Sequence, residues 1–233
     1  MSFQPTNPGR VLITGGASGL GAAVAAAVRD NGGTPIVLDR DISALSGVSA
    51  YEVDVADTAA VTETVRRAVQ EAGGLDAVVT AAGIDRCGRL EDVETAEWEK
   101  VVQVNLFGTV STVRAALPAL RESRGRVITV ASTLALKGVS DATAYCASKF
   151  GVLGFSQALA AELKGEVGVT QLIPGGMKTR FFDDRDEQYK PQDDSQLNDP
   201  ENVANAVLFA LAQPAGCEIR ELFIAHAEEG SWP

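Results

Sequence analysis

A short apolar run that leads into a cluster of glycines constrains this chain more than any other stretch. Residues 11–13 are apolar, and Gly15, Gly19 and Gly21 follow closely. The next stretch, Ala22 to Arg29, is rich in alanine, the residue with the highest helix propensity. A strand, a glycine turn and a helix in this order let the backbone turn tightly and present free helix N–H groups to a phosphate. The pattern predicts a phosphate-binding turn at Gly15, Ser18, Gly19, Leu20 and Gly21, with an unliganded βα turn as the alternative.

The next apolar run, Thr34 to Leu38, ends at Asp39 and Arg40. An acidic residue about twenty positions after such a glycine turn is where a ribose 2′-hydroxyl is held in dinucleotide-binding folds. A carboxylate there repels a 2′-phosphate, so Asp39 favours NAD(H) over NADP(H). Arg40 keeps NADP(H) open as an alternative, because a guanidinium can accommodate that phosphate.

Strand and helix patterns alternate along the remainder of the chain. Further strands are expected at 51–55, 75–80, 125–131, 167–173 and 221–225, and helices at 59–72, about 95–120, 144–164 and 202–212. Alternation with short connections predicts βαβ units with right-handed crossovers. We therefore expect one α/β domain over residues 1–233, a doubly wound parallel sheet with helices on both faces.

Three polar side chains are expected to meet at one end of this sheet. The apolar run 127–131 delivers Ser132 at its end, and the helix at 144–164 carries Tyr145 and Lys149 one turn apart on the same face. Ligands of open α/β sheets bind at the carboxyl ends of the strands, where the glycine turn also lies. The spacing Tyr-x-x-x-Lys is weak evidence by itself and gains weight from this setting.

Two other features are unusual for their position. Asn105 lies among apolar residues of the helix at 95–120, where its amide competes with the backbone, so a buried Asn105 must be satisfied by partners or used in chemistry. Residues 181–199 are polar, strongly charged and without periodicity, which suits a lid over the site or a surface excursion. Phe181 and Phe182 at its start indicate an apolar wall for a pocket.

Charge and composition exclude several kinds of partner and site. The net charge of −11 disfavours binding to nucleic acid and to anionic membranes, and no stretch approaches the length of a transmembrane helix. The polar N-terminus has no apolar signal core. Cys87, Cys146 and Cys217 are scattered, and His226 is the single histidine, so neither a metal site nor a disulfide framework is expected. These features predict a cytoplasmic protein.

Together these motifs resemble the short-chain dehydrogenase/reductase family, in its compact single-domain branch with a Rossmann-type fold. Thr14 and the glycines match the cofactor loop of that family, and the resemblance extends from Arg10 to Ile224. The catalytic set that it implies is Asn105, Ser132, Tyr145 and Lys149. The further cofactor contacts that it implies are Asp54 and Val55 at the adenine, Ala81, Ala82 and Gly83 at the ribose, and Pro174, Gly175, Met177 and Thr179 at the nicotinamide, with Tyr145 and Lys149 shared. The substrate would meet Ser132, Leu134, Tyr145, Gly176 and Phe181.

One departure from the family pattern follows the fourth strand. The family usually has Asn-Asn-Ala-Gly there, whereas this chain has Thr80, Ala81, Ala82 and Gly83. The missing amides remove part of the stabilisation of the central sheet, while the backbone contact to the ribose should survive.

The resemblance implies hydride transfer between NAD(H) and a secondary alcohol or ketone. Tyr145 would act as general acid and base, since the ammonium of Lys149 and the positive nicotinamide favour its phenolate over a phenol of pKa near 10. Ser132 would hydrogen-bond the substrate oxygen, Lys149 would also hold the nicotinamide ribose, and Asn105 would position a water.

Two alternatives remain open at this point, an NADPH-dependent ketoreductase of the 3-oxoacyl type and a nucleotide-binding regulator without turnover. Related enzymes commonly form tetramers through their two long helices, so a homotetramer, or a homodimer, is expected, with Trp232 packing on a neighbouring subunit.

Overall fold

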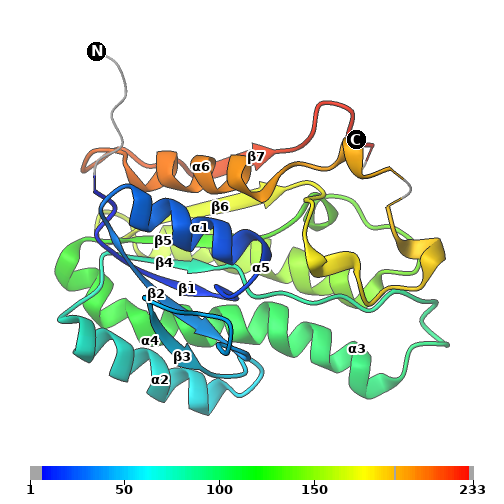
Figure 1. Ribbon diagram of the computed structural model, residues 1–233, viewed down its shortest axis with the longest axis horizontal. Coiled ribbons are helices and arrows are strands. Elements are labelled where there is room, and N and C mark those ends of the chain that lie inside the picture. The colour runs from blue at the N-terminus through cyan, green and yellow to red at the C-terminus, as the bar shows by residue number, and fades with distance from the viewer. Residues whose placement is uncertain (1–6, 192, 231–233) are drawn as a thin grey trace.

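All strands of the computed structural model lie in one parallel sheet (Figure 1), and the structure describes residues 7–191 and 193–230. The order across this seven-stranded sheet is β3-β2-β1-β4-β5-β6-β7. The strands are β1 (Arg10–Thr14), β2 (Thr34–Asp39), β3 (Ser49–Glu52), β4 (Ala77–Thr80), β5 (Arg126–Val130), β6 (Gly168–Pro174) and β7 (Glu221–Ile224). The order reverses next to β1, between β1 and β4, which is where open α/β sheets bind their ligands. Trp232 lies outside the described residues.

Helices cover both faces of the sheet (Figure 1). On one face are α1 (Gly19–Asp30) and α6 (Pro200–Leu211), and on the other are α2 (Thr58–Ala72), α4 (Gly108–Ser123) and α5 (Thr143–Glu162). Each face of the sheet has its own hydrophobic core. Successive residues of a strand point to opposite faces, so Val11 and Ile13 pack with α1 while Leu12 packs in the core on the other face. The expected doubly wound α/β fold is confirmed.

The long helix expected at 95–120 has three parts. It begins as α3 (Thr95–Val102), widens into a π-helical turn (Gln103–Phe107), and continues as α4 to Ser123. Asn105 sits in the π turn and is 1% exposed. Single π turns inside α-helices recur at functional sites, and this one carries the residue that the sequence marked as out of place.

The third strand is shorter than the sequence pattern indicated. It ends at Glu52, and the next residues form a turn in which the carboxylate of Asp54 accepts the N–H of Ala56 at 2.9 Å. Asp57 then caps α2 by accepting the N–H groups of Ala59 and Ala60. Carboxylates that bond nearby N–H groups favour turns over strands, which places Asp54 and Val55 just beyond the strand.

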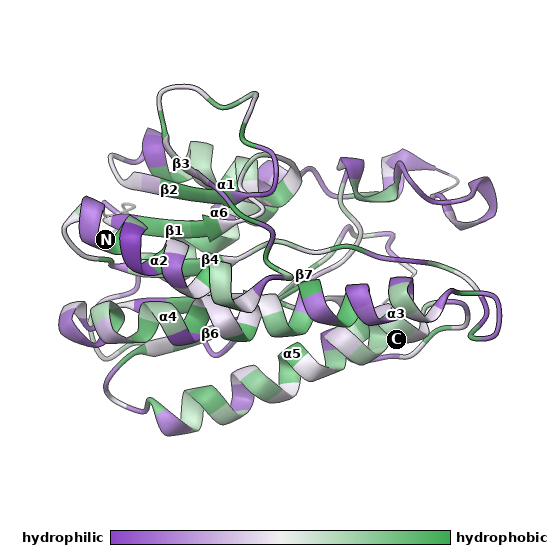
Figure 2. Cartoon of the chain, turned by 90° about the horizontal axis from the view of Figure 1, so that it is seen from below, coloured by the Kyte–Doolittle hydropathy of each residue, from purple (hydrophilic) through white to green (hydrophobic). Residues whose placement is uncertain are grey.

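The charged stretch after β6 runs away from the sheet and returns to it. It forms three single 3₁₀ turns, at Arg180–Phe182, Glu187–Tyr189 and Asp194–Gln196. A parallel bridge between Met177 and Asn198 closes its base. Figure 2 shows its predominantly hydrophilic character, and we refer to residues 180–199 as the excursion. None of the described helices has the length and apolarity needed to cross a membrane.

Candidate active site

The glycine turn after β1 is built for a close backbone approach. A Cβ on Gly15 would lie 2.8 Å from the Cα of Ala82, and Gly19 has a φ of +49° with Thr179 beside it. Ser18 is extended, and its side chain makes no cap hydrogen bond with the first N–H groups of α1. The turn therefore offers a tight cradle of backbone donors at the positive end of a helix, which fits the pyrophosphate of a dinucleotide.

Asp39 ends β2 beside this cradle. Its Oδ2 accepts the N–H of Ala17 at 2.9 Å, and its Oδ1 accepts the N–H of Asp41 at 3.2 Å. The carboxylate is thus fixed at the rim of the glycine turn, while Arg40 is exposed next to it. This is the position at which the ribose 2′-hydroxyl of a dinucleotide would be held.

The segment after β4 is held by one hydrogen bond from β1 and two from Asn105. The N–H of Ala82 donates to the hydroxyl of Thr14 at 3.2 Å. Asn105 accepts the N–H of Ile84 at 2.9 Å and donates to the carbonyl of Ile84 at 2.9 Å. It also donates to the hydroxyl of Ser148 at 3.0 Å. Every hydrogen-bonding group of the Asn105 amide therefore supports the backbone between Gly83 and Asp85 or the start of α5.

Thr80 is the first residue of the altered motif at the end of the fourth strand. Its hydroxyl oxygen is buried and has no hydrogen-bond partner within the ranges that the structure describes. Thr80 therefore does not replace the bonds that an asparagine amide could make there.

Ser132, Tyr145 and Lys149 converge at the carboxyl end of β5. The Ser132 hydroxyl accepts the N–H of Leu134 at 3.2 Å and also hydrogen-bonds the phenol of Tyr145. Lys149 reaches back to β5, where its Nζ donates to the carbonyl of Val130 at 2.9 Å, and lies 5.6 Å from the centre of the Tyr145 ring. The three side chains are exposed by less than a tenth, so their polar groups are turned into the protein.

Burial dominates the proton affinities of the phenol and the ammonium. Loss of solvation raises the pKa of Tyr145 to about 12, although its hydrogen bond with Ser132 lowers it in part. Loss of solvation also lowers the pKa of Lys149 to about 8, opposed by the carboxylate of Asp85. Both shifts follow from the preference of a buried group for its uncharged form. Burial is thus the largest effect on the pKa of Tyr145 in the protein chain alone, and a lowering by Lys149 together with an oxidised nicotinamide stays a prediction.

The excursion closes over this group of side chains. Phe181 packs on Tyr145 with ring centres 5.7 Å apart, and Leu134 joins the same apolar cluster. Arg185 lies over the rings of Phe181 and Phe182, at 5.2 and 4.6 Å from their centres. Two of the expected substrate contacts, Leu134 and Phe181, therefore do gather around Tyr145, but the two phenylalanines enclose a charged guanidinium and do not form a purely apolar wall.

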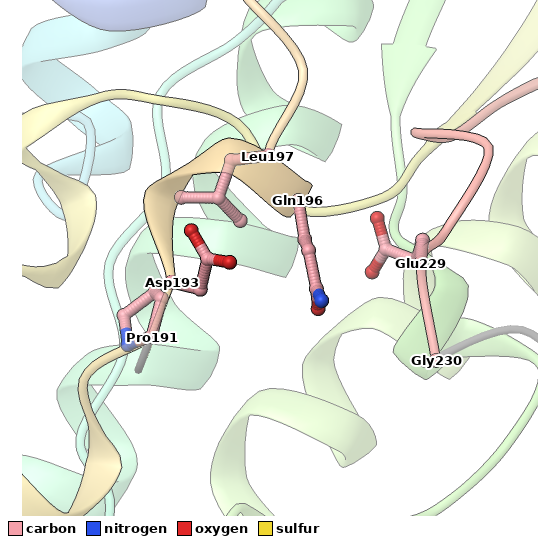
Figure 3. A pocket seen from close by; sticks show the side chains of 6 residues that line it. All are labelled: Pro191, Asp193, Gln196, Leu197, Glu229 and Gly230. Atoms are coloured by element: carbon pink, nitrogen blue, oxygen red, sulfur yellow. The ribbon is translucent and has the colours of Figure 1, made fainter.

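Gly176, a third expected substrate contact, lies in a different environment. Its N–H donates to the carboxylate of Glu229 at 2.8 Å, and Leu197 packs beside it. A hollow of about 380 Å³ opens near this contact, and Gln196 and Glu229 approach it from opposite sides (Figure 3). Its lining does not include Tyr145, Ser132 or Lys149. This hollow is therefore separate from the group of side chains around Tyr145.

Sequence reasoning missed three residues near the site: Asp85, Arg185 and Glu229. The position of Asp85, just after the Ala-Gly segment that follows β4, could have indicated that it lies near the site. Arg185 was one charge among many in an aperiodic stretch, and Glu229 gave no signal. In the described part of the chain, no cluster of three or more His, Cys, Asp and Glu side chains could hold a metal ion.

This chain matches a family of dehydrogenases and is similar to proteins described as oxidoreductases. The family described as short chain dehydrogenase matches residues 9–190. An uncharacterized oxidoreductase of Staphylococcus aureus strain MW2 is 33% identical over 224 residues, which cover 91% of this chain and 95% of that protein. An uncharacterized oxidoreductase of Staphylococcus saprophyticus is 30% identical over 227 residues, with coverage of 91% and 95%.

Solved structures show the same architecture. A short chain dehydrogenase from Burkholderia cenocepacia J2315 in complex with NADP has a TM-score of 0.85 at 26% identity, over 96% of this chain and 98% of that one. An alcohol dehydrogenase from the archaeon Thermococcus sibiricus, complexed with 5-hydroxy-NADP, has a TM-score of 0.85 at 24% identity, over 95% and 97%. The latter likeness speaks for the fold alone.

Proposed function

The chain belongs to the short-chain dehydrogenase family, and from this premise we propose that it transfers a hydride between a nicotinamide dinucleotide and a secondary alcohol or ketone. The observation that carries the proposal is the convergence of Ser132, Tyr145 and Lys149 at the carboxyl end of β5. The glycine cradle lies at the same edge of the sheet, after β1. A proton-transfer group and a dinucleotide site on one sheet edge are the two parts that alcohol oxidation requires.

Tyr145 is the general acid and base of the proposed reaction. In alcohol oxidation its phenolate takes the hydroxyl proton of the substrate, and in ketone reduction its phenol returns a proton to the oxygen. Ser132, which already hydrogen-bonds the phenol, holds the same substrate oxygen. The bound nicotinamide supplies the hydride acceptor or donor and, when oxidised, a positive charge. Such a charge, added to that of Lys149, opposes the effect of burial on the pKa of Tyr145.

Lys149 and Asn105 have supporting roles in the proposed reaction. With a pKa of about 8, Lys149 is protonated at neutral pH, and its ammonium lies 5.6 Å from the centre of the phenol ring. In the proposed reaction its charge favours the phenolate of Tyr145, and its N–H groups hold a ribose hydroxyl. Asn105 keeps the backbone of Ile84 in place. In the proposed reaction it also positions a water, as the family resemblance implies.

We propose NAD(H) as the preferred cofactor. The support is the carboxylate of Asp39, which is fixed at the rim of the glycine turn by the N–H of Ala17. A second candidate, an NADPH-dependent ketoreductase, is favoured by the exposed guanidinium of Arg40 beside it.

The proposal includes a homotetramer or homodimer in the cytoplasm, where the free cysteines at 87, 146 and 217 would stay reduced.

The test is a screen of secondary alcohols with NAD⁺ and NADP⁺, and of ketones with NADH and NADPH, followed at the nicotinamide absorbance. Turnover of at least one alcohol–ketone pair in both directions is the expected result. Tight dinucleotide binding without turnover of any pair would instead favour a nucleotide-binding regulator.

A further inference from the structure

Arg185 is the point at which the excursion is fastened to the rest of the protein. Its Nη2 donates to Oδ2 of Asp85 at 2.6 Å, and its Nη1 donates to the carbonyl of Tyr189 at 3.2 Å. Its guanidinium covers the rings of Phe181 and Phe182. One side chain thus joins the two 3₁₀ turns of the excursion nearest the site to the segment after β4.

The Asp85–Arg185 ion pair differs from the surface pairs of this protein. The side chains of Asp85 and Arg185 are 2% and 16% exposed. By contrast, the side chains of Arg180 and Asp183, a pair on the same excursion, are 87% and 63% exposed and 3.7 Å apart. An exposed pair contributes little, whereas loss of one partner from a buried pair leaves an uncompensated charge.

The buried pair is connected to Tyr145 through one aromatic ring. Phe181 links the two, because its ring packs on the phenol ring on one side and under the guanidinium on the other. Asp85 also hydrogen-bonds the N–H of Arg86 and the thiol of Cys87, so its carboxylate is held in one place. Movement of Arg185 would therefore release Phe181 and leave the charge of Asp85 near the phenol.

We propose that Asp85 and Arg185 are a positioning pair for Tyr145, which seats the start of the excursion on the phenol and balances there the negative charge of Asp85. This inference rests on the proposed function, in which Tyr145 exchanges the proton. The excursion then has a second role besides covering the site. It places the guanidinium of Arg185 beside the carboxylate of Asp85 and so neutralises its charge.

The charges around Tyr145 give this pair a distinctive signature. The phenol is faced by Lys149 and Cys146 from its own helix, by Asp85 from the segment after β4, and by Arg185 from the excursion. Asp85 raises the pKa of Tyr145 and Arg185 lowers it. Removing one charge should therefore move the proton affinity of the phenol in the opposite direction from removing the other.

The pH dependence of alcohol oxidation tests the charge balance. The basic form of Tyr145 is needed, so kcat rises with pH through the pKa of the phenol in the cofactor complex. Arg185→Gln should move this rise to higher pH and Asp85→Asn to lower pH, each by about half to one pH unit. The double variant should lie between the two single variants. Arg180→Gln and Asp183→Asn, on the exposed pair, should leave the profile in place.

Hydrogen exchange of residues 180–190 tests the fastening without any turnover. Asp85→Asn and Arg185→Gln should each speed exchange there by about tenfold or more, and the two exposed-pair controls should not. Arg185→Lys, which keeps the charge and loses the planar stacking, should speed exchange while retaining most of the wild-type pH profile.

Two results would overturn the inference. Wild-type exchange in both Asp85→Asn and Arg185→Gln would show that the pair does not fasten the excursion, whether or not a substrate is known. Shifts of the pH profile in the same direction, or no shift, would show that the pair has no charge-balancing role. A wild-type protein that turns over no alcohol would count against the proposed function instead, and the exchange measurement would still decide on the fastening.

Discussion

Lys149 is bonded to the strand that delivers Ser132. Its Nζ donates to the carbonyl of Val130, the last residue of β5, at 2.9 Å. This bond fixes α5 against β5 and holds an ammonium in a place where it is 5% exposed. The pKa of Lys149 falls to about 8 because burial disfavours the charge. The protein therefore keeps a cation beside Tyr145 at the expense of folding stability.

This expense should appear as a pH dependence of stability. The folded pKa of Lys149, about 8, lies below its ordinary value of 10.5, so the unfolded chain binds more protons between these values. The free energy of unfolding should then rise as the pH rises across that window. This gain in stability should be lost again as the pH falls through 8. Relative to Lys149→Met, the wild type should gain on the order of 3 kcal/mol between pH 7.5 and 10.5. Urea unfolding of both proteins across this range measures it.

The control for this prediction is Lys164→Met, because Lys164 is exposed just beyond α5. Its difference from the wild type should not vary with pH. A constant difference for Lys149→Met as well would mean that Lys149 has its ordinary pKa in the folded protein.

Tyr145→Phe removes the acidic proton while keeping the ring that packs against Phe181. Turnover should fall by about 10²–10⁴-fold, the range for loss of a positioned acid–base group. Binding of NADH, followed by its fluorescence, should change little. Tyr51→Phe is the matched control, since Tyr51 bonds Glu71 at the far end of the sheet order. Full turnover in Tyr145→Phe would remove the phenol from the mechanism.

The sequence was sufficient to predict the sheet and the meeting of Ser132, Tyr145 and Lys149, because strand and helix periods determine which residues share an edge or a face. It could not pair Asp85 with Arg185, since that contact depends on the path of an aperiodic stretch that returns to the sheet one hundred residues later. The contact of Glu229 with Gly176 depends in the same way on the path of a different irregular segment, the one after β7. The π turn at Asn105 was visible only as a polar residue in an apolar helix.

Asn105→Ala tests whether this amide has a structural role. The variant loses two part-buried hydrogen bonds with the backbone of Ile84 and one buried hydrogen bond with Ser148. Its free energy of unfolding should fall by about 2–4 kcal/mol, measured by urea unfolding. Asn105→Asp keeps an acceptor for the N–H of Ile84 and, only while it is protonated, a donor for the Ile84 carbonyl, so it should lose less stability at low pH than at high pH. An unchanged free energy of unfolding in Asn105→Ala would contradict a structural role and leave proton transfer as the role of this residue.

Two exposed aromatic side chains bear on the oligomeric state. Phe107 at the π turn and Phe150 on α5 are 49% and 45% exposed, and they lie on the two long helical stretches expected to form subunit contacts. Light scattering at micromolar concentration should give the mass of a homotetramer. Phe150→Glu should lower that mass, because a charge at an apolar contact loses its solvation. Gln70→Glu, which adds the same charge to α2, should not. A monomeric wild type would contradict the expectation.

Asp39 should decide the choice between the two cofactors. Its carboxylate is fixed by the N–H of Ala17 and stands where a 2′-hydroxyl would donate to it and a 2′-phosphate would be repelled. Asp39→Ala removes both effects, and loss of one hydrogen bond to a charged group is worth about 1.5–3 kcal/mol. The ratio of kcat/KM for NAD⁺ to that for NADP⁺ should therefore fall by about tenfold or more. Arg40→Ala, next to it and exposed, should leave use of NAD⁺ unchanged and weaken any use of NADP⁺. A wild type that prefers NADP⁺, and loses this preference in Arg40→Ala, would show that the guanidinium outweighs the carboxylate.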